Sequence, residues 1–280
     1  MIPQQESIAW GPEKALHAVS NMTVSMTEDL ATPEKPADTP TKVEEPKSSK
    51  AYPPVLLKGE IKIFPDRRLP HYDQGEIKAY AAASSEGAQA FAMVCEKYIV
   101  PQSEIVHKYA GIITPHLPKL IACGVVDWVV DNKERFVFVY EDKLGKPVAE
   151  GKNPAAMGLR AELVISTIFR NILDVMHAMR DKGITHGNIR VQNLYDGGSN
   201  TFENTMLGEA LTAPSGYSQP VIYETITRAL SLPLGKGPAE FSDDIYALGV
   251  TVAALLRTQD PAEGLSDDEI IAQKMEIGSF

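Results

Sequence analysis

The sequence is poor in several features that define whole classes of protein. It has two cysteines in 280 residues, Cys95 and Cys123, which are too few for a disulfide framework or a cysteine zinc site. Both have apolar neighbours, so we expect small buried side chains in a protein of the reducing cytoplasm. No stretch approaches the roughly 18 apolar residues of a membrane span, and the N-terminus lacks the pattern of a secretory signal.

Positive charge is also scarce. Lysine and arginine number 27 against 37 aspartates and glutamates, which gives a net charge of −10. An acidic surface repels the phosphates of nucleic acids and of anionic membranes, so we expect neither as a partner. The hydrophobic content of 44% is nevertheless sufficient for a large buried core.

Large apolar side chains are almost missing from the first part of the chain. Residues 31–50 consist mainly of proline, glutamate, lysine, serine and threonine. Such a segment cannot bury enough apolar surface to offset the entropy lost on ordering. We therefore predict that residues 1–52 form a disordered tail.

Short strand-like runs begin at Val55. They cover 55–57, 61–64, 90–95 and 136–140, and turns rich in glycine, proline and aspartate separate them. One short helix is expected between residues 102 and 110. Residues 53–140 are therefore predicted to form a small, strand-rich unit.

The remainder, residues 141–280, is predicted to be helical, which makes the chain an α+β protein. A second helix is expected near Ser242, which would cap it, and its body at 245–256 is apolar nearly all round, as in a buried helix. Ser266 and Glu269 form a capping box for a third helix. The first helix, at 161–179, has apolar residues on one face, and Gly183 ends it: these are Ile165, Ile168, Ile172, Val175 and Met179.

A motif lies between the first two of these helices. Residues 183–195 read G-I-T-H-G-N-I-R-V-Q-N-L-Y, which resembles the protein-kinase catalytic loop H-R-D-L-K-P-E-N-I-L, with His186 and Asn193 at matching positions. Downstream, residues 244–249, from Asp244 to Gly249, resemble the D-x-W-S-x-G that opens a central kinase helix. Three ordered matches, including the L-H-x-x-G-I-like approach at 176–184, are more specific than a single glycine motif.

The resemblance implies a two-lobed, protein-kinase-like fold. The strand-rich N-lobe would be residues 53–140, and the helical C-lobe 141–280. The family has further helices after the third, so the C-lobe is expected to be partial and to offer apolar surface to a partner. In the family's pattern His186 packs within the loop, Asp244 accepts backbone N–H groups of residues 186–188, and Glu224 would pair with an arginine beyond residue 280.

The residues needed for phosphoryl transfer depart from that pattern. Asn188 stands where the proton-accepting aspartate would be, and an amide is not a general base near neutral pH. Gly187 replaces the neighbouring arginine, and Val94 takes the position of the phosphate-binding lysine. No G-x-G-x-x-G occurs in residues 53–140, so no phosphate cradle is evident.

The metal-binding D-F-G has two possible registers, 206–208 and 209–211, and neither contains aspartate. Glu209 could still supply a hard oxygen ligand, and with Asn193 it could hold Mg²⁺ weakly. Lys97, three residues after Val94, is the nearest substitute for the missing lysine. Lys97, Asn193 and Glu209 are therefore the candidate residues for ATP and magnesium, although neither cofactor is required by the sequence.

Two functions remain open. The first is a pseudokinase, a kinase-like module that regulates or binds a protein partner with weak or no ATP binding. The alternative is an atypical ATP-dependent kinase or nucleotidyl transferase that uses Glu209, Asn193 and Lys97. The base, the lysine and the glycine loop are all missing from the kinase-like pattern. This favours the pseudokinase, because each of them is needed for phosphoryl transfer.

Overall fold

The computed structural model describes residues 52–149, 159–199, 201–257 and 262–277. These residues belong to one compact unit. The tail expected at 1–52 lies outside them, apart from Tyr52. Among the helices of this described part, none is long and apolar enough to cross a membrane.

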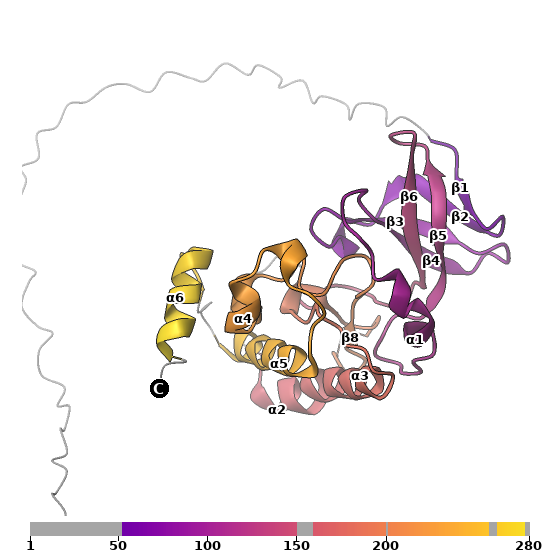
Figure 1. The fold of residues 1–280 in the computed structure, drawn as a ribbon. Helices are drawn as coiled ribbons and strands as arrows, with labels where there is room; N and C mark the ends of the chain where they lie inside the picture. The colour runs from indigo at the N-terminus through magenta and orange to yellow at the C-terminus, as the bar shows by residue number, and fades with distance from the viewer. Residues whose placement is uncertain (1–51, 150–158, 200, 258–261, 278–280) are drawn as a thin grey trace, which may run out of the picture. The chain divides into compact units, whose positions relative to one another are not determined.

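The chain is an α+β protein whose β part is one six-stranded antiparallel sheet (Figure 1). The strand order is β1-β2-β3-β4-β6-β5. The two outer strands also approach each other, because a Cβ at Gly124 in β5 would lie 3.2 Å from Cδ1 of Leu57 in β1. The strands are β1 (Val55–Leu57), β2 (Ile61–Arg68), β3 (Lys78–Ala83), β4 (Gln89–Val94), β5 (Leu120–Trp128) and β6 (Lys133–Glu141).

Four of the strands coincide with predicted runs, and two were not predicted. β3 reads K-A-Y-A-A-A, and its alanines give no β-strand signal. β5 is interrupted by Gly124, which weakens a strand pattern. Both strands are held by their neighbours, since β3 pairs along its length with β4 and β5 pairs with β6.

Alternation along β4 divides the core into two clusters. Ala90, Ala92 and Val94 pack with residues of the other strands in a cluster confined to the sheet. Phe91 and Met93 point to the opposite face and belong to the larger cluster, which joins the sheet to the helical part. The sheet is thus buried on both faces along β4, and the second face carries the contacts described below.

Most of the helical elements follow the six-stranded sheet, and the short helix α1 lies between β4 and β5, at the predicted place. Figure 1 shows α3 beside α5, and these two helices contact each other. The α-helices are α1 (Val106–Ala110), α2 (Ala161–Leu163), α3 (Arg170–Asp181), α4 (Ile226–Ala229), α5 (Phe241–Leu256) and α6 (Asp267–Ile277); a π-helical segment spans Val164–Phe169, 3-10 helices include Pro70–Tyr72, Ser103–Ile105, Val191–Asn193, Val221–Tyr223 and Pro233–Gly235, and a two-stranded ribbon pairs β7 (Leu194–Tyr195) with β8 (Met206–Leu207).

The predicted buried face of the first helix is correct except at its start. Ile168, Ile172, Val175 and Met179 are buried, but Ile165 is 49% exposed. The π-helical segment Val164–Phe169 causes the difference, because its wider turn rotates the side chains away from the 3.6-residue spacing. Val164 is buried in place of Ile165.

Two expectations for the second helix, α5, were wrong. Its N-cap is Glu240 rather than Ser242, and Glu240 forms a reciprocal capping box with Asp243. The helix is also not buried all round, because Ile245 and Leu256 are 44% and 37% exposed. The helix packs against α3, the π-helical segment Val164–Phe169 and the 3-10 helix Val221–Tyr223. Its buried face consists of Asp244, Ala247, Leu248, Thr251, Ala254 and Leu255.

The capping box predicted for the third helix, α6, is confirmed. Glu269 accepts from Ser266 N at 2.8 Å, and Ser266 Oγ accepts from Glu269 N at 3.4 Å. Further along, Lys274 Nζ donates to the carbonyls of Val221 and Ile222 at 2.7 and 3.0 Å. These bonds attach α6 to the 3-10 helix at Val221–Tyr223.

Gly249 lies in the middle of α5, and a Cβ there would meet no atom within 4 Å. The packing therefore does not require glycine at this position. We expect Gly249→Ala to raise the free energy of unfolding by about 0.5–1 kcal/mol, because alanine loses less backbone entropy in a helix. Urea denaturation would measure the gain, and a loss of stability would show that the position has a close neighbour after all.

Candidate functional site

The segment that resembles a catalytic loop begins after α3, where Gly183 has a φ of +64°. His186 is fully buried in this loop. Its Nδ1 accepts from Asn188 N at 3.2 Å, so its Nε2 carries the proton and donates to the Gly208 carbonyl at 3.1 Å. Burial lowers the pKa of His186 to about 4, which keeps the ring neutral. Both ring nitrogens are hydrogen-bonded to backbone groups, so the role of His186 is structural.

Asp244 fixes the same loop from α5. Its two carboxylate oxygens accept from His186 N at 2.7 Å and Gly187 N at 2.8 Å. This is the contact that the sequence predicts for Asp244. Burial raises the pKa of this carboxyl to about 6, although the two N–H groups oppose that shift.

Gly187 must be glycine. Its φ is +69°, and a Cβ there would lie 2.5 Å from the Cβ of Ser215. The Gly187 carbonyl also accepts from Gly216 N at 2.7 Å. The arginine that the kinase pattern has at this position cannot be accommodated, because Ser215 occupies the space.

The side chain of Asn188 is held by Gln74 and Arg190. Gln74 lies in the loop between β2 and β3, residues 69–77, and is 1% exposed. Its Oε1 accepts from Asn188 Nδ2 at 3.3 Å and from Arg190 Nη2 at 2.7 Å. Asn188 Oδ1 in turn accepts from Arg190 Nε at 3.0 Å. The residue at the catalytic-aspartate position is thus bonded to the chain itself through both atoms of its amide.

Asn193 is bonded in the same way. Its Oδ1 accepts from Gln74 Nε2 at 3.0 Å, and its Nδ2 donates to the backbone carbonyls of Asn188 and Glu209 at 2.9 and 3.2 Å. A Cβ added at Gly208 would lie 2.0 Å from Asn193 Oδ1. A side chain cannot be placed at 208 without displacing Asn193.

The carboxylate of Glu209 caps its own turn. Its oxygens accept from Leu211 N and Thr212 N, each at 3.0 Å, and from Thr212 Oγ1 at 2.6 Å. Burial raises the pKa of this carboxyl, and these three donors oppose the shift. Asn193 and Glu209 are close in space, because Asn193 Nδ2 donates to the Glu209 carbonyl. The oxygen atoms that would bind a metal, Asn193 Oδ1 and the Glu209 carboxylate, already accept hydrogen bonds within the chain.

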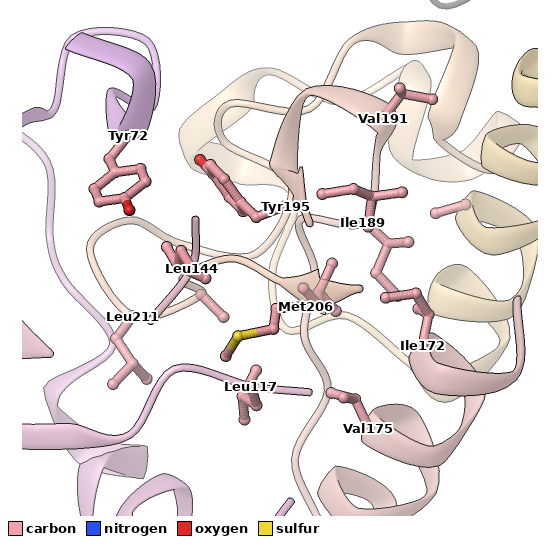
Figure 2. Packing of buried hydrophobic residues seen from close by; sticks show 14 of the residues in the cluster. Tyr72, Leu117, Leu144, Ile172, Val175, Ile189, Val191, Tyr195, Met206 and Leu211 are labelled. Carbon is pink, nitrogen blue, oxygen red and sulfur yellow. The ribbon is translucent and has the colours of Figure 1, made fainter. Parts of the chain in front are cut away.

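Aromatic rings close the space between the sheet and the loop. Tyr72, at the end of the 3-10 helix Pro70–Tyr72, is buried, and its ring lies 4.8 Å from Phe91 and 5.4 Å from Tyr195. Figure 2 shows Tyr72 and Tyr195 facing each other across this space. The hydroxyl of Tyr72 lies 3.0 Å from Asp142 Oδ1 and 3.1 Å from the Gly145 carbonyl.

The hollow bounded by His186, Asn188 and Glu209 has a free volume of about 10 Å³, roughly one water molecule.

Lys97 does not join the other candidate residues. It is exposed and lies beyond the end of β4, which ends at Val94. Val94 is buried in the cluster confined to the sheet. No hydrogen bond or ion pair from the Lys97 ammonium to Asn193 or Glu209 occurs in the part of the chain that the structure describes.

Sequence reasoning missed Gln74, Tyr72 and Arg190, which complete the site. A single glutamine in P-H-Y-D-Q-G has no spacing or composition that points to chemistry. Its role depends on a contact with residues more than a hundred positions away. Comparison with known proteins gives no match, since no family model and no curated protein matches this chain.

Proposed function

We propose that this chain is a protein-kinase-like module that does not transfer phosphate and that acts by binding a protein partner in the cytoplasm. One observation carries the proposal. Asn188 and Asn193 are both hydrogen-bonded to the buried carboxamide of Gln74, so the two residues nearest to a transfer site are occupied by the chain's own side chain. A site for transfer needs these groups free for metal and substrate.

The kinase-like fold is supported by the order of the elements. A strand-rich part precedes a helical part, a short helix lies between β4 and β5, and Asp244 bonds the 186–188 loop as it does in the family. The partner-binding function is supported by three leucines at 61%, 80% and 61% exposure, Leu230, Leu232 and Leu234, because exposed apolar groups in one segment are typical of interaction surfaces.

We expect calorimetric titration with Mg-ATP to give no measurable heat, that is, a dissociation constant weaker than about 1 mM. The reason is that Lys97 does not join Asn193 and Glu209, whose side chains are already hydrogen-bonded within the chain. An active protein kinase titrated in parallel is the positive control. Micromolar binding that Glu209→Ala abolishes would instead support an atypical kinase or nucleotidyl transferase.

A further inference from the structure

The β2–β3 loop, residues 69–77, covers the cluster formed by Asn188, Arg190 and Asn193. Its tip, Gly75 and Glu76, is exposed, whereas Tyr72 and Gln74 are buried beneath it. The loop is therefore more than a surface connection, because the buried side chains of Tyr72, Gln74 and Ile77 lie between the sheet and the helical part.

Gln74 makes every one of its side-chain bonds across that space. Its Nε2 donates to Asn193 Oδ1 at 3.0 Å and lies 3.3 Å from Tyr195 Oη. Its Oε1 accepts from Asn188 and Arg190. A single carboxamide thus connects the loop to four residues of the segment 188–195.

This connection is made without a carboxylate. Arg190 is largely buried, and desolvation lowers its pKa. Within the described ranges its side chain has no ion pair, and both acceptors that it contacts are carboxamide oxygens, from Gln74 and Asn188. Bonds from a guanidinium to neutral acceptors are weaker than bonds to carboxylates, so this attachment can be released more readily than an ion pair.

The loop is also attached through the hydroxyl of the buried Tyr72, which bonds Asp142 and the Gly145 carbonyl, and through contacts at its rim. Glu76 Oε2 accepts from Tyr217 Oη at 3.2 Å in an exposed position. Leu69 N donates to the Ala79 carbonyl at 3.0 Å, which closes the base of the loop next to the sheet. Gln74 and Ile77 bond each other through both backbone N–H groups, each at 3.1 Å, so the tip is a turn closed within the loop itself. Beyond the base, the bonds between the loop and the rest of the chain each involve a side chain, which allows the loop to open without unpairing β2 and β3.

We propose that the β2–β3 loop is an internal plug that opens as a unit and exposes Asn188, Arg190 and Asn193 while the sheet and the helices stay folded. The inference rests on the proposed function in so far as the covered cluster is the site of that proposal. The plug closes the site in the ground state, and its release controls whether anything from solution reaches these residues.

Hydrogen exchange of the full chain tests the plug. In Gln74→Ala we expect backbone amides in peptides covering 69–79 and 186–195 to exchange about tenfold faster than in wild type, with those of α3 unchanged. The matched control is Gln102→Ala. Gln102 also bridges the two parts, since its Nε2 donates to the Ala210 carbonyl at 2.7 Å and its Oε1 accepts from Ser215 Oγ at 3.4 Å, but it does not contact the loop. This control should leave both peptides at wild-type rates.

Two results would overturn the plug: equal acceleration in α3, which means general loosening, or no acceleration in either peptide. If Gln74→Ala does not fold, Glu76→Ala removes the exposed contacts of the loop tip with Tyr217 and Tyr98. It should accelerate exchange in 69–79 about threefold, and an unchanged rate there would reject the proposal. Exchange tests the plug, whereas calorimetry with Mg-ATP tests the proposed function, so the two can fail separately.

Discussion

Lys236→Ala is expected to lower the free energy of unfolding by about 3–5 kcal/mol, because it leaves a buried carboxylate without its cation. Lys236 Nζ lies 2.5 Å from Glu224 Oε1, and the two side chains are 6% and 1% exposed. The second oxygen of Glu224 already lacks a hydrogen-bond partner within the described residues. Burial raises the pKa of Glu224, and the lysine opposes that shift.

Equilibrium unfolding in urea measures this loss, with Lys143→Ala as the matched control. Lys143 pairs with Glu141 at 2.7 Å, but the two side chains are 67% and 36% exposed, so its removal should cost less than about 1 kcal/mol. The double variant Glu224→Leu, Lys236→Met should recover most of the stability, because apolar residues of similar size replace buried pairs well. A loss in Lys236→Ala no larger than in Lys143→Ala would contradict the role of the pair.

A lysine of the nearby loop at 231–240 supplies the cation for Glu224. From the resemblance, the partner of Glu224 was expected to be an arginine beyond residue 280. The structure places Lys236, twelve residues away, against this carboxylate. The expected arginine lies outside the 280 residues, so that expectation stays a prediction. A buried carboxylate needs some cation, which burial and charge predict, but which cation reaches it depends on the path of the loop at 231–240.

Features that depend on local spacing could be predicted. The face of α3 follows from residues three and four apart, and the capping box of α6 follows from Ser266 and Glu269. The contact between Asp244 and the 186–188 loop was also predicted, because the resemblance placed both partners. In each case the signal lies within a few residues or within a motif of known geometry.

Features that depend on the third dimension could not be predicted. In the π-helical segment Val164 is buried in the core and Ile165 is exposed, and no residue in the sequence indicates that change. Gln74 is one of many polar residues until the fold brings it to Asn193. The candidate residues were identified, but their partners, which decide whether they can act, follow from packing alone.

Two buried titratable groups that contact each other's segments, His186 in the 186–188 loop and Asp244 in α5, oppose each other as the pH changes. The folded-state pKa of His186 is lowered from 6.5 to about 4 by burial, so the unfolded chain binds more protons between these values. Its contribution to stability therefore rises with pH across that window. The pKa of Asp244 is raised from 3.8 to about 6, so its contribution falls as the pH rises through nearly the same window. The two dependences nearly cancel in the wild type.

His186→Gln is expected to separate them. The difference in unfolding free energy between wild type and variant should grow by about 3 kcal/mol from pH 4 to pH 6.5, because a pKa shift of one unit corresponds to about 1.4 kcal/mol. Glutamine can still donate to the Gly208 carbonyl, which limits the change to the loss of the titrating group. The measurement is urea denaturation of both proteins at several pH values, with His107→Gln, an exposed histidine in α1, as the control. If the difference in unfolding free energy between wild type and His186→Gln stays constant with pH, burial does not hold His186 neutral. The structural role assigned to its ring, bonding the backbone of residues 188 and 208, would then be wrong.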